Sequence, residues 1–282
     1  MHLRQNADKV FVTTTDSENS LSVTGSFTSD GETNTDAVIY SKDDLVLNGV
    51  GSLEISSTDN GVTSKDDLKV TGGTITINCQ SDALEAKDSI AVADGTISIN
   101  AKKDGLHAED SDDTSKGYIY ICGGTFNITA DSDGIQATTI IQIDGGEFTI
   151  NSSEGLESTF IQINDSTINI KASDDGINAS RGSGSVDVKV EINGGSLTIE
   201  MGAGDTDGID SNGDLYINGG TISVTGQSPF DYDGTAEHNG GTMIVNGEET
   251  DTITNQFMGG GPGGQGGNRG GMPNDMQGGF PG

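Results

Sequence analysis

Residues 207–224 have the sequence DGIDSNGDLYINGGTISV, and this stretch decides the fold. It contains three short runs that alternate apolar and polar residues, GIDS, LYI and TISV, with Asn218-Gly219-Gly220 between the second and the third. A period of two directs successive side chains to opposite faces of a strand. The residues expected to point into a core are Ile209, Leu215, Ile217, Ile222 and Val224.

The same unit recurs along the chain every 21 to 23 residues. Its glycine position is occupied by Gly61, Ala83, Gly105, Gly134, Gly155, Gly176 and Gly208, with Val38 and Pro229 in the flanking units. Two longer gaps hold insertions, roughly at 110–116 and 182–187, and such insertions at one phase are typical of loops at one edge of a solenoid. The pattern predicts an all-β fold, a right-handed single-stranded parallel β-helix of about nine coils with three short strands per coil. We expect the glycines to supply positive φ at turns.

This domain is expected to span residues 1–257. The strand-like VFVTTT (Val10–Thr15) begins almost at once, so we expect upstream coils, a signal peptide or both to precede it. Residues 258–282 are rich in glycine with Met, Gln, Asn and Pro, which predicts a disordered tail.

The chain has 282 residues and 44 acidic against 13 basic side chains, a formal net charge of −31. This balance argues against nucleic-acid binding, which needs clustered Lys and Arg. No apolar stretch approaches the length of a membrane span, so we expect no membrane insertion. We expect the protein to be a monomer.

A carboxylate precedes the repeated glycine in most units, and stacked coils place such residues about 4.8 Å apart. Neighbouring charges at that spacing repel by about 1 kcal/mol in water and about 3 to 4 kcal/mol at an effective dielectric of 20. Calcium, which accepts six to eight oxygen ligands, is the natural ion to offset this. The ladder contains Asn60, Asp82, Asp104, Asp133, Glu154, Asp175 and Asp207.

Oxygen ligands become denser toward the C-terminal half, where we expect calcium. Acidic and amide residues join the ladder there, namely Asp174, Asn178, Asp205, Asp210, Asp231 and Asp233. The alternative is that Asp or Asn before Gly serves only a tight turn.

Lys42, Lys65 and Lys87 form a second ladder, each followed by acids. Solvated salt bridges between coils are one interpretation. A clamp for a substrate carboxylate is the other, and it makes these lysines candidate ligand-binding residues. Tyr232 is a further candidate, because the chain has no tryptophan to stack on a sugar. His107 has no His or Cys partner at zinc-ligand spacing, so the sequence predicts no zinc site there.

The segments SKDDL, DDGINAS, DTDGIDSNG and FDYDG together resemble clostridial-type carbohydrate-binding β-helix proteins, which are related in fold to family-9 pectate lyases. The resemblance covers nearly all of the chain from about Ala7. It implies a secreted or cell-surface protein that binds calcium and acidic polysaccharide, notably polygalacturonate, with cellulose as a second ligand and no established cleavage. Carried over by position, its calcium ligands are Asp174, Asp175, Asn178, Asp207, Asp210, Asp231 and Asp233. No catalytic residue is assigned.

Two other function classes stay open. A polysaccharide lyase would use calcium to acidify the uronate α-proton and a Lys or Arg to abstract it. A structural or adhesive surface protein would use calcium only to staple the rod.

Overall fold

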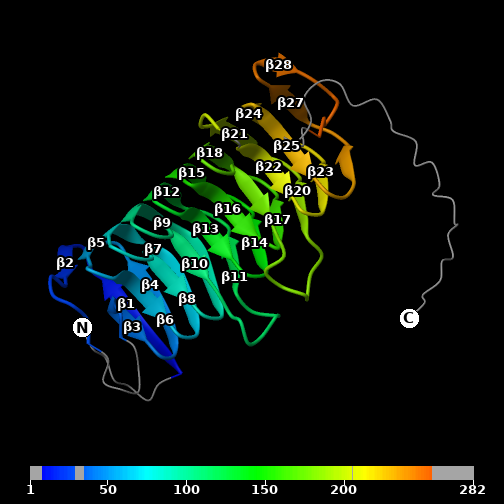
Figure 1. Ribbon diagram of the computed structural model, residues 1–282. Helices are drawn as coiled ribbons and strands as arrows, with labels where there is room; N and C mark the ends of the chain where they lie inside the picture. Colours follow the sequence, from blue (N-terminus) through cyan, green and yellow to red (C-terminus); the bar gives the residue numbers. More distant parts are fainter. Residues whose placement is uncertain (1–7, 29–34, 205, 256–282) are drawn as a thin grey trace, which may run out of the picture.

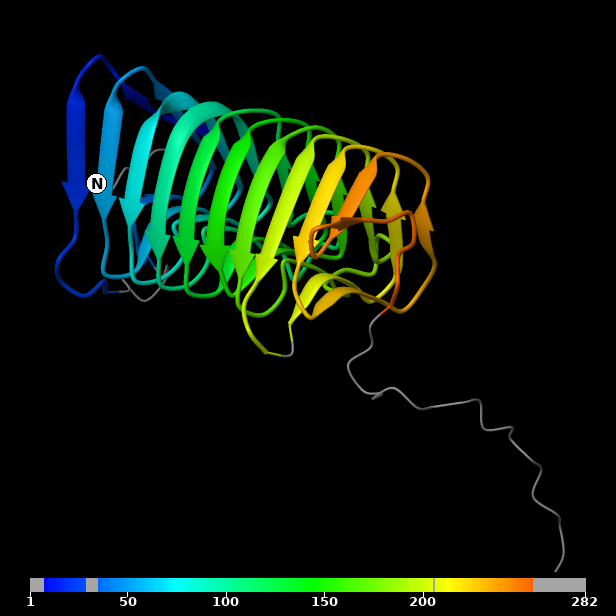
Figure 2. The ribbon, with the colours of Figure 1, turned by 90° about the horizontal axis from the view of Figure 1, so that it is seen from above.

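The computed structural model describes residues 8–28, 35–204 and 206–255, so Asp205 and the glycine-rich tail predicted from residue 258 lie outside the described residues. Within them the fold is all-β, and successive strands stack in parallel into an elongated solenoid (Figure 1). The described residues contain no helix long and apolar enough to cross a membrane. Seen from above, the strands lie side by side in chain order from one end of the rod to the other (Figure 2).

One side of the solenoid is a sheet of nine strands, one from each of nine successive coils. This number agrees with the repeat count. The strands of this sheet are β3 (Ala37–Ser41), β6 (Asn60–Ser64), β8 (Leu84–Ala86), β10 (Leu106–Ala108), β13 (Asp133–Ala137), β16 (Glu154–Ser158), β19 (Ile177–Ala179), β22 (Asp207–Ser211) and β25 (Ser228–Tyr232).

The remaining strands form a 19-stranded sheet that supplies the other two walls. One wall contains β1 (Lys9–Thr14), β4 (Asp44–Gly49), β11 (Tyr118–Ile121), β14 (Ile140–Ile143), β17 (Phe160–Ile163), β20 (Lys189–Ile192), β23 (Asp214–Ile217) and β26 (Ala236–His238). The other contains β2 (Glu18–Ser22), β5 (Ser52–Ser56), β12 (Thr125–Ala130), β15 (Glu147–Ser152), β18 (Thr167–Ala172), β21 (Ser196–Met201), β24 (Thr221–Thr225), β27 (Thr242–Val245) and β28 (Glu248–Glu249). The long strands β7 (Asp67–Asn78) and β9 (Ser89–Ala101) run through both walls.

These two strands are where the expectation of three short strands per coil is wrong. In β7 the second and third runs join through Thr71, Gly72 and Gly73, and the pairing with β9 shifts register there instead of breaking. Both glycines have positive φ, which lets the backbone turn the corner without leaving the sheet.

A single apolar core fills the solenoid. The five residues predicted to point inward, Ile209, Leu215, Ile217, Ile222 and Val224, are all fully buried. Aromatic side chains are few, but Phe126 and Phe148 stack in adjacent coils with ring centroids 4.5 Å apart. The core therefore follows from the period-two pattern.

The glycine that follows each ladder residue acts differently from the expectation. Gly134 and Gly155 lie inside strands, not in turns, and neither has positive φ. A Cβ on Gly155 would lie 2.3 Å from the carbonyl oxygen of Gly176 and 2.7 Å from Ile170 Cγ2. Glycine is required there because the next coil and the core approach too closely for a side chain.

Candidate functional site

The nine-stranded sheet carries two columns of polar side chains on its outer side. The first column is the predicted ladder, Asn60, Asp82, Asp104, Asp133, Glu154, Asp175 and Asp207. The second column lies three residues further along each strand and contains Thr63, Glu85, His107, Gln136, Glu157, Asn178, Asp210 and Asp231. Because the strands are in register, members of a column are neighbours across the coils.

Backbone groups hold the first column in place. Asp82 Oδ1 accepts a hydrogen bond from the N–H of Asp104 at 3.0 Å, and Asp104 Oδ1 accepts one from the N–H of Asp133 at 3.1 Å. Asp175 Oδ1 accepts the N–H of Asp207 at 3.1 Å. The partner is therefore the next coil, not the residue two positions on that an ordinary Asx turn would use. In these three aspartates the backbone hydrogen bond occupies Oδ1, and Oδ2 remains for contacts with side chains or ions.

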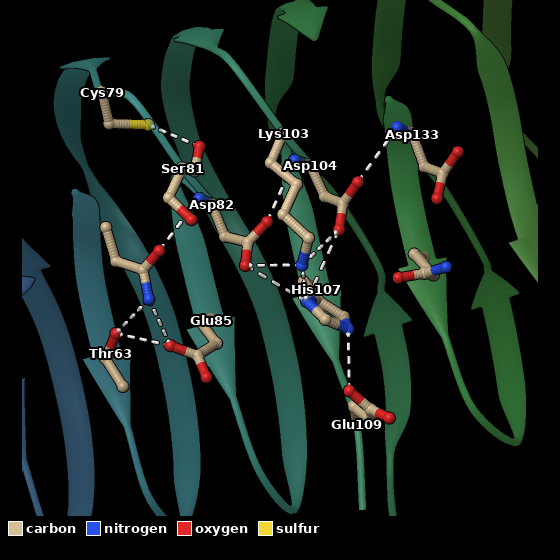
Figure 3. Close-up of polar contacts among 12 residues, drawn as sticks. Thr63, Cys79, Ser81, Asp82, Glu85, Lys103, Asp104, His107, Glu109 and Asp133 are labelled. Atoms are coloured by element: carbon tan, nitrogen blue, oxygen red, sulfur yellow. Dashed lines mark hydrogen bonds and ion pairs between the residues drawn. The ribbon is translucent and has the colours of Figure 1, made fainter. Parts of the chain in front are cut away.

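In the N-terminal half, basic side chains neutralise the column (Figure 3). Lys103 Nζ lies 3.1 Å from Asp82 Oδ2 and 3.3 Å from Asp104 Oδ2, and His107 Nδ1 lies 3.3 Å from Asp82 Oδ2. Burial alone would raise the pKa of Asp82, but the hydrogen bond and charge of His107, with Lys103, hold it at about 2. We call Asp82, Lys103, Asp104 and His107 the cation-paired cluster.

One coil earlier, an amide, a hydroxyl and a lysine surround Glu85. Asn60 Nδ2 and Thr63 Oγ1 donate to Glu85 Oε2 at 2.6 and 2.7 Å, and Lys65 Nζ lies 3.1 Å from Oε1. These contacts satisfy both carboxylate oxygens of Glu85 without a bound ion.

The next coils contain acids that accept hydrogen bonds from amide and hydroxyl groups but have no basic partner among the described residues. Carboxylate oxygens of Asp133, Glu154 and Glu157 come within 4.8 Å of one another, and we call these three residues the acid cluster. Burial, reinforced by Asp104 and the neighbouring glutamates, raises the pKa of Asp133 to about 8. Burial likewise raises the pKa of Glu154 to about 7. Among the described residues, no Lys, Arg or His forms an ion pair with these three carboxylates.

A second group of acids continues toward the C-terminal end. Burial and the charges of Asp174, Asp207 and Asp231 raise the pKa of Asp175 to about 6, although the N–H of Asp207 opposes the shift. Burial and the charges of Asp175, Asp231 and Asp207 raise the pKa of Asp210 to about 7. Asp174 and Asp233, also predicted as ligands, are exposed at the rim of this group.

Asn178 connects the two groups of acids. Its Nδ2 donates to Glu154 Oε2 at 3.0 Å, and its strand position is paired with Asp210. Its Oδ1 is buried and accepts no hydrogen bond within the described structure. An unpaired amide oxygen among carboxylates fits an oxygen-preferring cation such as Ca²⁺. Asp133, Glu154, Glu157 and Asn178 are thus the residues that would hold calcium.

The predicted lysine ladder is in register but largely occupied within the protein. Lys65 pairs with Glu85, and Lys87 lies 3.3 Å from Asp112 and 3.8 Å from Asp110. Lys42 is exposed. Tyr232 is half-buried and packs against the core, in the column otherwise occupied by Ser211, so little of its ring is open for stacking.

Comparison with known proteins identifies the family. The model of the family described as carbohydrate-binding domain-containing protein matches residues 3–204, which is 202 of 282 residues. The chain belongs to this family. The match includes the cation-paired cluster and the acid cluster, whereas Asp207, Asp210, Asp231 and Asp233 lie beyond it.

Two individual proteins are similar to parts of this chain. A carbohydrate-binding domain-containing protein of Acetivibrio thermocellus is 45% identical over 42 residues, which cover 14% of this chain and 15% of the relative. The similarity therefore spans well under two thirds of that relative. A solved structure of a polysaccharide lyase-like protein from C. thermocellum is 22% identical, with a TM-score of 0.44, over 72% of this chain and 87% of that one.

A pocket lies over the second column, beside the loop that holds the second insertion. The loops after β10 and β19 emerge at the same edge of the rod, as the repeat phase predicts (Figure 1). They touch each other, because Ser183 Oγ donates to the carbonyl of Thr114 at 3.1 Å. The pocket has a volume of about 360 Å³ and is lined by Lys103, His107, Glu109, Gln136, Glu157 and Ser180, among others.

Several residues of this site escaped the sequence reasoning. Glu157 has the same repeat phase as Asn178, so extending that column by one coil would have found it. For His107, the sequence shows no His or Cys partner at zinc-ligand spacing. Its actual neighbours are two aspartates, and Asp82 comes from the preceding coil, 25 residues away.

Proposed function

We propose that this protein binds acidic polysaccharide of the polygalacturonate type without cleaving it, and that Ca²⁺ bridges the protein and the glycan. The observation that carries the proposal is that some acids of the two columns have basic partners and others have none among the described residues. Asp82 and Glu85 have basic partners, whereas Asp133, Glu154 and Glu157 lie together without one among the described residues. Membership of a carbohydrate-binding family supports a glycan as the partner.

The charge of the protein makes a bridging cation necessary for such a ligand. A chain of net charge −31 repels a polyuronate. A calcium ion at the acid cluster would neutralise most of the local negative charge, and its flexible coordination shell of six to eight oxygens has room for glycan carboxylates.

The state of the basic residues favours binding over cleavage. A lyase needs a base that is deprotonated at working pH. Burial lowers the pKa of Lys103, but the charges of Asp82 and Asp104 outweigh burial and raise it. Burial likewise lowers the pKa of His107, but the hydrogen bond and the charge of Asp82 outweigh burial and raise it. Both basic side chains that line the pocket are therefore stabilised in the protonated form.

Three further points belong to this proposal. We infer that the coils wind right-handedly, as parallel strand-to-strand crossovers nearly always do. The protein acts as a monomer outside the cell or at its surface, where a polysaccharide ligand is found. Cellulose is a weaker ligand, because Tyr232 is half-buried and the chain has no tryptophan.

The test is retention of the full chain on immobilised polygalacturonate, with millimolar calcium or with chelator. We expect retention only with calcium, and loss of retention in Glu154→Gln and Glu157→Gln, which each remove a ligand of the acid cluster. Glu200→Gln is the matched control, because Glu200 is an exposed acid paired with Lys171 at 2.7 Å on another wall. Retention that is equal with calcium and chelator, or absent in both, contradicts the proposal.

A rod stapled by calcium alone would behave differently. Its melting temperature would rise with calcium in the same samples while polygalacturonate failed to retain it. Measuring both quantities on one preparation separates a binding protein from a purely structural one.

A further inference from the structure

Three potential metal-ligand atoms meet in the cation-paired cluster. His107 Nδ1 lies 3.3 Å from Asp82 Oδ2 and 3.5 Å from Asp104 Oδ2, and all three ligand atoms lie within 4.8 Å of one another. The residues are 8%, 4% and 1% exposed. A tetrahedral ion with bonds of about 2.0–2.1 Å separates its ligands by about 3.3–3.4 Å. The histidine–aspartate spacings match that geometry.

Surrounding groups orient these ligands as they do in metal sites. Backbone N–H groups of Asp104 and Asp133 hold Oδ1 of Asp82 and of Asp104, so that both Oδ2 atoms face the imidazole. On the far side of the ring, His107 Nε2 lies 3.6 Å from Glu109 Oε2 (Figure 3). A carboxylate behind the second ring nitrogen is the usual support of a metal-bound histidine.

The cluster already attracts a cation, which is the ammonium of Lys103. Lys103 donates a hydrogen bond to Asp82, but its contact with Asp104 Oδ2 at 3.3 Å is an ion pair only, and that buried oxygen accepts no hydrogen bond. The Lys103 side chain is 49% exposed, so it is able to leave the cluster for solvent. The nearest cation to this buried oxygen is thus a half-exposed lysine, which an incoming ion is able to replace.

We propose that Asp82, Asp104 and His107 form a site for a divalent transition-metal ion of the Zn²⁺ class, which displaces the ammonium of Lys103 and releases the proton of His107 Nδ1 to solvent. The imidazole nitrogen selects such an ion over Ca²⁺, which prefers ligand sets made wholly of oxygen. Lys103 and His107 both line the pocket over the second column, so the position that Lys103 vacates opens into it. The site is separate from the acid cluster and does not depend on the proposed function.

The test is calorimetric titration of the full chain with Zn²⁺ in saturating calcium. We expect one zinc equivalent to bind the wild type, and His107→Gln to bind it at least ten times more weakly. Lys103→Ala should bind zinc about ten times more tightly, because the competing cation is gone. Glu109→Gln should weaken binding by about ten-fold or more, as expected for an outer-shell partner.

His238→Gln is the matched control, since His238 lies near the C-terminal end of the rod and contacts Asp251 instead. Cobalt substitution gives a second readout, because four-coordinate Co²⁺ absorbs strongly in the visible range and His107→Gln should abolish the bands. The proposal is overturned if His107→Gln and Lys103→Ala bind zinc as His238→Gln does. Circular dichroism of each variant shows whether its fold is intact.

Discussion

At the scale of single residues, one repeated position acts in two electrostatic ways. At Asp82 the partners His107 and Lys103 overcome burial and hold the pKa at about 2. At Asp133, two coils further on, burial and neighbouring acids raise the pKa to about 8. The same repeat position thus has basic partners in one coil and, in the other, none among the described residues, so that burial there favours the protonated carboxyl.

The substitution Asp133→Asn tests this difference. Above the pKa of about 8 the substitution removes a disfavoured negative charge but keeps the side-chain shape, so in chelator at such a pH we expect the melting temperature to rise by about 2–4 °C for each kcal/mol regained. With calcium the gain should reverse, because a ligand is lost. Differential scanning calorimetry measures both states.

Asp131→Asn is the control, since Asp131 is exposed and pairs with Lys102 at 3.0 Å. It should change the melting temperature little in either buffer. Equal responses of the two variants would contradict the electrostatic account of Asp133.

At the scale of strands, close contact between coils leaves room only for glycine at the position after the ladder residue in the coil of β16. Gly155→Ala would place a Cβ 2.3 Å from the carbonyl oxygen of Gly176, so β16 and β19 would have to separate. We expect a loss of about 1–3 kcal/mol, measured by urea denaturation. Gly184→Ala, where nothing lies within 4 Å, should be neutral. An unchanged midpoint in Gly155→Ala would show that the coils adjust without cost.

The strands themselves were largely predictable from the sequence. The period of about 22 residues predicted the coil number, the buried faces and the edge at which both insertions emerge, because each depends on local pattern. The joining of β7 and β9 across two walls was not predictable, since Thr71-Gly72-Gly73 resembles the turns of other coils. The close packing at the glycines that follow the ladder residues was also missed, because it depends on the neighbouring coil. The predicted positive φ is confirmed at other glycines, such as Gly220.

The site was predictable in outline only. The ladder column follows from the repeat, but the partners of each acid come from other coils through long side chains. Lys103 bonds to Asp82, 21 residues earlier, and the choice depends on rotamers that no repeat alignment contains. Sequence therefore located the carboxylates without separating the neutralised ones from those still lacking a counter-charge.

At the scale of the whole molecule, the raised pKa values link stability to pH. A carboxyl group whose pKa is higher in the folded state than in the unfolded chain favours folding when protonated, and that contribution is lost as pH rises through the folded value. Asp175 at about 6, Glu154 and Asp210 at about 7 and Asp133 at about 8 all have this sign.

In chelator we therefore expect the melting temperature to fall between pH 5 and about pH 8. Calcium should flatten this fall, because it stabilises the deprotonated carboxylates. Thermal scans at several pH values with and without calcium measure the effect. A melting temperature in chelator that stays constant or rises over this interval would contradict it.

The contact between the insertion loops affects how the solenoid unfolds. A solenoid coil normally touches only its neighbours, so unfolding can begin at an end and proceed one coil at a time. Thr114 follows β10 and Ser183 follows β19, with the coils of β13 and β16 between them, so their bond links coils that do not adjoin. The segment from β10 to β19 should therefore exchange its amide hydrogens as one cooperative unit, while the outer coils fray independently.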